Sequence, residues 1–256
     1  MRLFSTLILC LFAFSFASNE YLTLGDHYYS KRAEGAKNNN ADPKNIKEAI
    51  KNYTLALGNQ AAREEAAWKL LRAYYFLGCF TMSKNPKDRK IHFEKAKKEG
   101  KVFFNEFPKN NEVIYWYSVN LALWAVEVNP FVALNAGSVK ESREIAQKLI
   151  EAEKRGDKKA AARGYQILGR AHHKVPKIAF VLNWVNRDSA ETYLLKAYML
   201  DKGDLVNSLF LAEYYKDQKD TSMAKATLLP FLKNKPRPEE FLEDERNFIK
   251  MRKLLE

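Results

Sequence analysis

The sequence predicts an all-α protein built as a series of helix hairpins. Apolar residues recur at helical spacing along most of the chain, and nowhere is there the sustained period-two alternation that a strand needs. Clusters of Gly, Pro, Asn and Asp interrupt this pattern at intervals of roughly ten to twenty-odd residues. We therefore expect about five helix hairpins, followed by a final helix from Pro238 to Glu256.

The first segment of the chain is apolar. Arg2 precedes an unbroken apolar run over residues 7–14, and small residues follow at Ser15 and Ala17. This order is typical of a secretory signal peptide, so we expect cleavage after Ala17. A transmembrane anchor is the alternative, but the apolar run is shorter than the roughly 20 residues that a bilayer requires.

Cysteine content and charge favour an exported protein without nucleic-acid binding. Cys79 is the one cysteine after the predicted cleavage point, so packing alone must hold the fold. A secreted animal module of this size would usually contain several cysteines, which favours a bacterial periplasm. The net charge is +12, with lysines scattered throughout and no nucleic-acid motif; this surface favours an acidic partner by electrostatic steering. We predict a signal peptide over 1–17 and one helical domain over 18–256.

The breaks between the predicted helices fall at turn-forming clusters. Each contains Pro, Gly, Asn or Asp, as expected between the helices of a hairpin array. In chain order they lie at residues 38–43, 84–86, 107–111, 128–130, 154–157, 174–177, 201–204 and 233–238.

A spacing of large residues recurs in the first helix of several hairpins. Trp68, Leu71 and Tyr75 match the W-x2-L-G-x2-Y signature of a tetratricopeptide repeat, with Arg72 where Gly is usual. The same spacing, with Tyr for Trp, occurs at Tyr21, Leu24, Gly25 and Tyr28, and at Tyr165, Leu168, Gly169 and His172. The chain therefore resembles the tetratricopeptide family, whose fold is a superhelical array of such hairpins. An unrelated helical bundle is the alternative.

The second helices carry a small-large-small pattern that supports the same resemblance. Short side chains allow two helices to approach closely, and the large residue fills the adjacent gap. The pattern appears at Ala49, Tyr53 and Ala56, and at Ala190, Leu194 and Ala197. In the last unit the first helix has Ser208, Leu211, Ala212 and Tyr215, the second has Ala224 and Leu228, and Pro236 closes the repeat.

The helix from Glu112 to Val128 is apolar nearly all round, which predicts a central helix buried on every face. Asn120 is the one strongly polar residue of its interior. Either its amide makes a structural hydrogen bond, or it faces a cavity walled by Trp116, Tyr117 and Trp124.

An apolar insert marks a second irregular region. Between Leu168 and Tyr198, roughly nine extra residues separate the two helices of one repeat. The insert from Val175 to Arg187 carries Phe180 and Trp184, which is unusual for a solvated loop. We expect it to pack on the concave face of the array, on another subunit or on a bound ligand.

No motif for catalysis or metal binding is present. His172 and His173 are adjacent, so on a helix they point about a hundred degrees apart and cannot share a metal as an HExxH pair does. The sequence has no nucleophile elbow, no phosphate loop and no paired carboxylates in an apolar setting. We therefore expect no enzyme, no metal and no cofactor. A hydrolase with a dispersed site would need perturbed titratable residues clustered in a cleft.

Two stretches give a narrower resemblance. The runs from Glu112 to Ala125 and from Tyr165 to Leu229 resemble the T-component (TatT) proteins of periplasmic TRAP transporters, over roughly residues 60–235. The second run also resembles eukaryotic regulators of microtubule dynamics, which the signal peptide disfavours. The T-component resemblance implies a hydrophobic cleft or pore, a homotrimer and association with a solute-binding protein. Those proteins are commonly lipid-anchored, whereas Leu9 before Cys10 does not form a lipobox.

The sequence as a whole predicts a periplasmic or secreted binding protein, and the resemblance implies an accessory of a TRAP-type solute transporter. Its partner would be a protein, such as a solute-binding protein, or an apolar small molecule. A cell-envelope scaffold that holds peptides or helices in an open groove is the alternative. The predicted binding residues are Trp116, Tyr117, Asn120, Trp124, Phe180 and Trp184.

Overall fold

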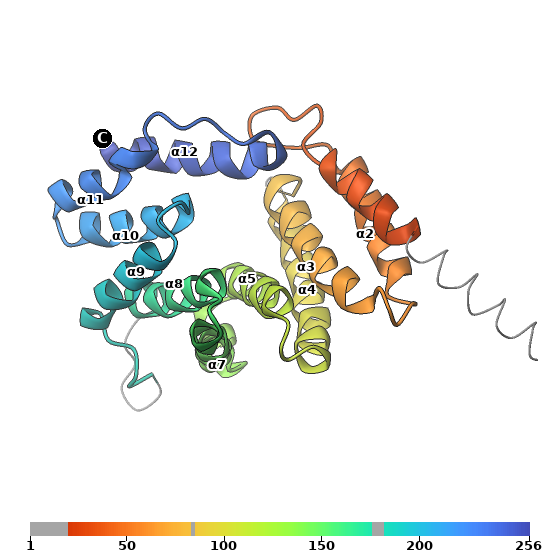
Figure 1. Cartoon of the computed structure of the whole chain (residues 1–256), viewed down its shortest axis with the longest axis horizontal. Coiled ribbons are helices and arrows are strands. Elements are labelled where there is room, and N and C mark those ends of the chain that lie inside the picture. Colours follow the sequence, from red (N-terminus) through yellow and green to blue (C-terminus); the bar gives the residue numbers. More distant parts are fainter. Residues whose placement is uncertain (1–19, 83–84, 176–181) are drawn as a thin grey trace, which may run out of the picture. The chain divides into compact units, whose positions relative to one another are not determined.

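The computed structural model describes residues 20–82, 85–175 and 182–256, and within these ranges the regular structure is helical (Figure 1). One isolated β-bridge pairs Lys37 with Asn40 in the loop before the second helix. The chain forms two compact units, Met1–Pro130 and Phe131–Glu256. The predicted signal peptide, residues 1–17, lies outside the described residues, and the single domain over 18–256 stays a prediction.

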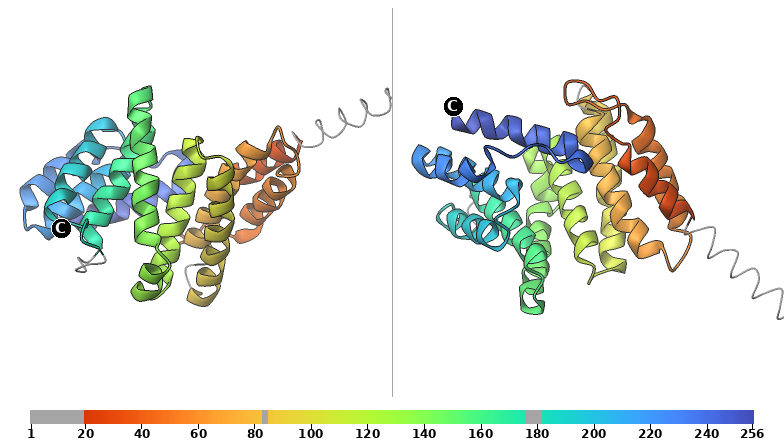
Figure 2. Two further views of the ribbon diagram at one scale, coloured as in Figure 1. Left: turned by 90° about the horizontal axis from the view of Figure 1, so that it is seen from below. Right: turned by 45° about the horizontal axis from the view of Figure 1, so that its top comes forward.

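Over residues 20–82 and 85–130, the first unit contains a helix at residues 20–30 and four longer helices. These are α2 (Pro43–Ala56), α3 (Arg63–Phe80), α4 (Pro86–Glu106) and α5 (Asn111–Glu127). Helix α3 packs against α2, α4 and α5, and α4 also packs against α5. Figure 2 shows from two further sides that the yellow α4 and the yellow-green α5 lie side by side. The helix over residues 20–30 also contacts α3, through the ion pair of Asp26 with Lys69 at 2.7 Å, so α3 is the element that the other described helices of this unit share.

In its described part, residues 131–175 and 182–256, the second unit contains six α-helices after the short helix α6 (Pro130–Asn135) at the unit boundary. They are α7 (Ser138–Ile150), α8 (Lys158–Lys174), α9 (Asp188–Leu200), α10 (Leu205–Asp217), α11 (Thr221–Leu228) and α12 (Phe241–Leu255). Short 3-10 turns lie at Glu151–Arg155, Leu229–Phe231 and Pro238–Glu240. Helix α8 packs between α7 and α9, and α10 contacts α9, α11 and α12.

Side-chain caps fix where most helices begin. An Asp or Asn at each start accepts a hydrogen bond from a backbone N–H of the first turn, which has no partner within the helix. Proline follows directly at the start of α2 and α4, where its missing N–H costs nothing. The capping residues are Asp42, Asn85, Asn110, Asp157, Asp204 and Asp220. Several of them stand in the clusters that the sequence marks as breaks.

Small residues let neighbouring helices touch. A Cβ atom added at Gly169 of α8 would lie 2.6 Å from the Cγ atom of Leu194 on α9. At Gly164 the added Cβ would lie 2.7 Å from the backbone oxygen of Ala146 on α7, and a backbone atom cannot move aside as the end of a side chain can. Gly169 and Leu194 are the signature positions named from the sequence, so the repeat pattern reflects a close contact between helices.

The prediction of an all-α array of helix hairpins with a final helix is confirmed. One detail is wrong, because α5 is not buried on every face: Val126 is 76% exposed and Ala122 is also exposed. Apolar side chains are common on protein surfaces, so an all-apolar helix need not be enclosed. Among the described residues, no helix is both long and apolar enough to cross a membrane.

Candidate protein-binding site

Asn120 joins α5 to α3 in the interior of the first unit. Its side chain is fully buried, and its amide nitrogen donates to the carbonyl oxygens of Leu71 at 2.9 Å and Trp116 at 2.8 Å. A buried amide that donates to the neighbouring helix holds the two helices in one register. The structure thus gives Asn120 the structural hydrogen bonds that were one of its two sequence interpretations.

Tyr117 and Trp124 also lie in the interior of this unit, with 1% and 3% of their surface exposed. The Tyr117 ring packs on Phe104, and the Lys97 ammonium lies 3.3 Å from the centre of the Trp124 ring. These contacts account for the burial of both side chains by packing within the unit. Their role in ligand binding stays a prediction.

Trp116 differs from its neighbours because it is only partly buried. Its ring centre lies 5.5 Å from that of Tyr75 on α3, and Tyr75 also meets Phe80 edge-on. Tyr75 in turn shares one side of α3 with Trp68 and Arg72, which are also partly buried. We call Trp68, Arg72, Tyr75 and Trp116 the α3–α5 aromatic face.

The spacing within α3 produces this face. Positions 68, 72 and 75 follow the i, i+4, i+7 pattern that places side chains on one side of a helix. The buried residues of α3, among them Leu70, Ala73 and Leu77, lie at other positions around the helix and pack into the unit. The sequence indicates Trp68 and Tyr75 only as repeat-packing residues; Arg72 in place of the usual Gly is the signal that distinguishes this repeat.

Trp184 lies in the second unit, in the described part of the insert. Its ring meets His172 edge-on at 5.3 Å, and the Arg143 guanidinium lies 5.0 Å from its centre. His172 Nδ1 accepts a hydrogen bond from the backbone N–H of Asn186 at 2.9 Å and stacks on Tyr193. Burial lowers the pKa of His172, which keeps the acceptor nitrogen free of a proton. The end of the insert thus packs onto His172 of α8 and Arg143 of α7.

Phe180 lies outside the described residues, so its predicted role is untested. The structure describes the other five predicted residues, and their joint role in binding stays a prediction. Three of them are interior residues of the first unit, Trp116 belongs to the α3–α5 aromatic face, and Trp184 anchors an insert in the second unit.

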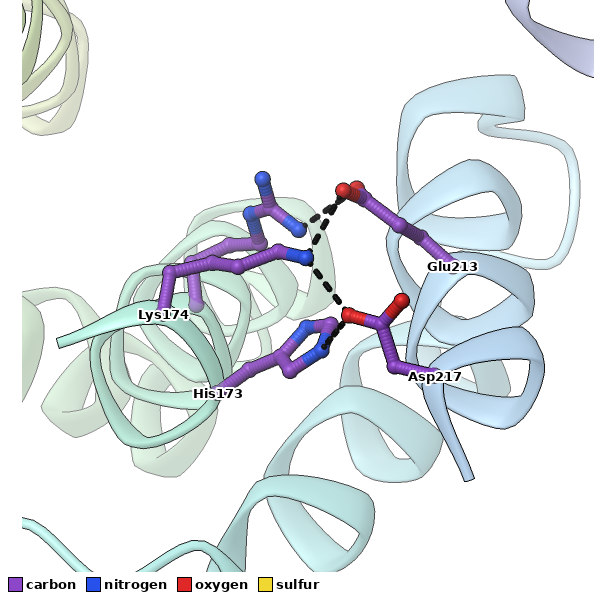
Figure 3. Close-up of polar contacts among 5 residues, drawn as sticks. His173, Lys174, Glu213 and Asp217 are labelled. Atoms are coloured by element: carbon purple, nitrogen blue, oxygen red, sulfur yellow. Dashed lines mark hydrogen bonds and ion pairs between the residues drawn. The ribbon is translucent and has the colours of Figure 1, made fainter. Parts of the chain in front are cut away.

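A charged network connects α8 to α10 in the second unit (Figure 3). His173 Nε2 donates to the Asp217 carboxylate at 2.8 Å, and Lys174 Nζ reaches Asp217 at 2.8 Å and Glu213 at 2.9 Å. Arg170 completes the network with a 2.7 Å contact to Glu213. Burial lowers the pKa of His173 and Lys174 lowers it further, so the imidazole is neutral when it donates. The network joins α8 to α10, which are separated in the chain by α9.

The described residues offer no grouping suited to a metal, since no three His, Cys, Asp or Glu side chains among them come together. Two shallow surface hollows lie along α4 and between α7 and α8, and neither is lined by residues of α5. The α3–α5 aromatic face is the feature best suited to a partner, because partly exposed Trp, Tyr and Arg side chains are enriched at binding hot spots.

Comparison with protein families adds a further finding. Residues 36–183 match the profile of the family described as plant specific mitochondrial import receptor subunit TOM20. The chain belongs to this family. The match covers more than half of the chain and includes the α3–α5 aromatic face. No curated protein matches the sequence.

Membership of the TOM20 family overturns the narrower sequence interpretation. The resemblance to T-component proteins is wrong, and so are the TRAP-transporter accessory role, the cell-envelope scaffold and the periplasmic or secreted location. These errors share a physical cause: helix-hairpin signatures specify packing rather than partners, so the same fold serves many functions. A scarcity of cysteines is equally ordinary in a protein that is not secreted.

The family finding agrees with the broader expectations. Its description names a receptor and not an enzyme, and an import receptor acts by binding proteins. At that level the expected protein partner is supported. The solute-binding protein and the trimer followed only from the T-component resemblance and have no further basis.

Proposed function

We propose that this chain is a receptor subunit of mitochondrial protein import that binds a polypeptide segment of its partner on the α3–α5 aromatic face. Family membership supports the receptor role. The observation that points to this face is the group of partly buried Trp68, Tyr75 and Trp116 side chains. Large side chains beside them in the chain, Tyr74 and Tyr117, are buried. The chain performs no chemical step in this role.

The aromatic side chains suit segment binding for a physical reason. Rings bury much apolar surface while only two side-chain torsions become fixed, so they anchor a partner at low entropic cost. The Asn120 hydrogen bond to α3 holds Trp116 close to Tyr75 before any partner arrives. A preorganised face loses less conformational freedom on binding, and the affinity rises accordingly.

Site-specific photo-crosslinking in intact mitochondria tests this proposal. A photoreactive phenylalanine analogue replaces Trp68 in the full chain, and the matched control carries it at Ile91, which is 70% exposed on α4. Cells that produce either variant are fractionated, the isolated mitochondria are irradiated during import of a precursor, and adducts are identified by mass spectrometry.

We expect the chain in the mitochondrial fraction, with adducts from position 68 to the precursor or to an import subunit, and none of these from position 91. Absence of the chain from mitochondria would refute the receptor role. Identical adducts from both positions, or none from position 68, would refute the assignment of the face.

A further inference from the structure

Arg72 is the cation of α3 that has no carboxylate partner among the described residues. Arg63 forms an ion pair with Glu106, and Lys69 contacts both Asp26 at 2.7 Å and Glu65 at 2.6 Å. No comparable contact is made by Arg72, whose buried Nε atom has no hydrogen-bond partner in the described part of the chain. A partly buried guanidinium without an anion is costly unless a binding partner supplies one.

Two aromatic rings hold this guanidinium in place. Its central carbon lies 4.1 Å from the ring centre of Tyr29 and 4.9 Å from that of Trp68. Stacking of this kind fixes the plane of the guanidinium and leaves its edge free to donate hydrogen bonds. The side chain is therefore oriented before a ligand binds.

The surroundings of Arg72 combine one charge with apolar surface. Tyr75 follows it by three positions on the same side of α3, and Trp116 packs on Tyr75. A planar guanidinium matches a carboxylate through two parallel hydrogen bonds, and these bonds strengthen beside rings that exclude water. The complementary ligand is a segment that carries a carboxylate next to apolar side chains.

The net charge of the chain also favours an acidic ligand. With a net charge of +12, the protein attracts acidic segments and repels basic ones. Mitochondrial targeting segments are rich in Arg and poor in acidic residues, so they would place like charges at Arg72.

We propose that the α3–α5 aromatic face binds an acidic segment of a protein partner, with a carboxylate on Arg72 and adjacent apolar side chains on Trp68, Tyr75 and Trp116. The inference rests on the proposed function and specifies its ligand. The segment at this face is thus an acidic stretch of a precursor or of an import subunit, outside the basic targeting sequence.

Peptide binding to the full chain in mild detergent tests the proposal. Three fluorescent amphipathic peptides share their apolar positions and carry Glu, Gln or Arg at the polar ones, and anisotropy gives each Kd. We expect wild type to bind the Glu peptide roughly tenfold to a hundredfold more tightly than the Gln peptide, with the Arg peptide weakest. Binding of the Glu peptide should weaken as salt is added.

Two substitutions of Arg72 distinguish the two-hydrogen-bond geometry of the guanidinium from its positive charge. Arg72→Gln should abolish the preference for the Glu peptide, and Arg72→Lys should retain only part of it. Lys98→Gln is the matched control, because it removes a positive charge from a 73% exposed side chain on α4 and should leave the preference intact. Circular dichroism confirms that each variant is folded.

Three results would overturn the inference: equal affinity of wild type for the Glu and Gln peptides, an unchanged preference in Arg72→Gln, or tightest binding of the Arg peptide. If one of these results is found and position 68 still gives specific crosslinks in mitochondria, the receptor role is retained and only the acidic ligand is refuted. Loss of the crosslinks would remove the receptor face itself.

Discussion

Replacing Asn120 by Asp tests how the core of the first unit is held together. The two side chains have nearly the same shape, but the amide nitrogen that donates to Leu71 at 2.9 Å and to Trp116 at 2.8 Å becomes an oxygen. An ionised carboxylate would then face two carbonyl oxygens in a site with no exposed surface. We expect the carboxyl group to take up a proton instead.

The cost follows from that protonation. Raising the pKa of an Asp from about 3.9 to above pH 7 costs about 1.4 kcal/mol per unit, or about 4 kcal/mol. The protonated acid donates one hydrogen bond where the amide donates two, which removes about 1 kcal/mol more. Asn120→Asp should therefore lower the free energy of unfolding by about 5 kcal/mol at pH 7, and by about 2 kcal/mol at about pH 4.5, where protonation costs little.

Urea unfolding followed by circular dichroism measures this loss, with each variant compared with wild type at the same pH. Asn105→Asp on α4 is the control, because Asn105 is exposed and its substitution should change stability by less than about 0.5 kcal/mol. A loss below about 2 kcal/mol at pH 7, or one that does not depend on pH, would show that Asn120 faces water in a cavity and would refute the packing explanation.

Three further changes probe the second unit, each by urea unfolding. Gly164→Ala should cost about 1–3 kcal/mol, because its new methyl group would lie 2.7 Å from a backbone oxygen of α7, whereas Gly203→Ala meets nothing closer than 3.8 Å and should be nearly neutral; equal effects would contradict the close helix contact. Burial lowers the pKa of His173, so as pH decreases below about 6.5 the unfolded chain binds a proton that the folded chain does not, and the free energy of unfolding decreases. His173→Gln should make this decrease shallower; an unchanged slope would show that His173 is not buried as a neutral group. Burial raises the pKa of Asp244, but two side-chain hydrogen bonds from Arg237, both at 2.8 Å, outweigh it and lower that pKa. Asp244→Asn should therefore cost about 1–2 kcal/mol at pH 7, and the loss should shrink progressively as pH falls below the ordinary Asp pKa of about 3.9; a loss that does not change in acid would argue against the ion pair.

Much of the fold was predictable because its signals are local. The small-large-small spacing at Ala190, Leu194 and Ala197 predicts a helix that packs closely on another, and all three residues are buried. Capping residues such as Asp157 and Asp204 stand in the turn clusters and mark helix starts directly. Each of these features depends on residues within a few turns of one another, so one sequence is enough.

The candidate site was less predictable because it depends on distant neighbours. Trp68 and Trp124 look alike in the sequence, yet Lys97 from another helix covers Trp124 while Trp68 stays partly exposed. Arg72 stands out as a departure from the repeat signature, but the ring of Tyr29 that orients it lies on a helix far away in the chain. The location was wrongly predicted for another reason. The prediction rested on the apolar segment before Ala17 and on the scarcity of cysteines, and a low cysteine content does not distinguish one compartment from another.

Cations laid over rings make part of this chain sensitive to chemical modification. Lys97 over Trp124 and Arg143 over Trp184 hold positive charge against aromatic surface. Acetylation of Lys97 would neutralise its charge and weaken its attraction to the indole at the same time. A modifying enzyme that acts at this lysine would therefore loosen the interior of the first unit as well as alter the surface. In this chain, some charges cannot be changed without disturbing the packing beneath them.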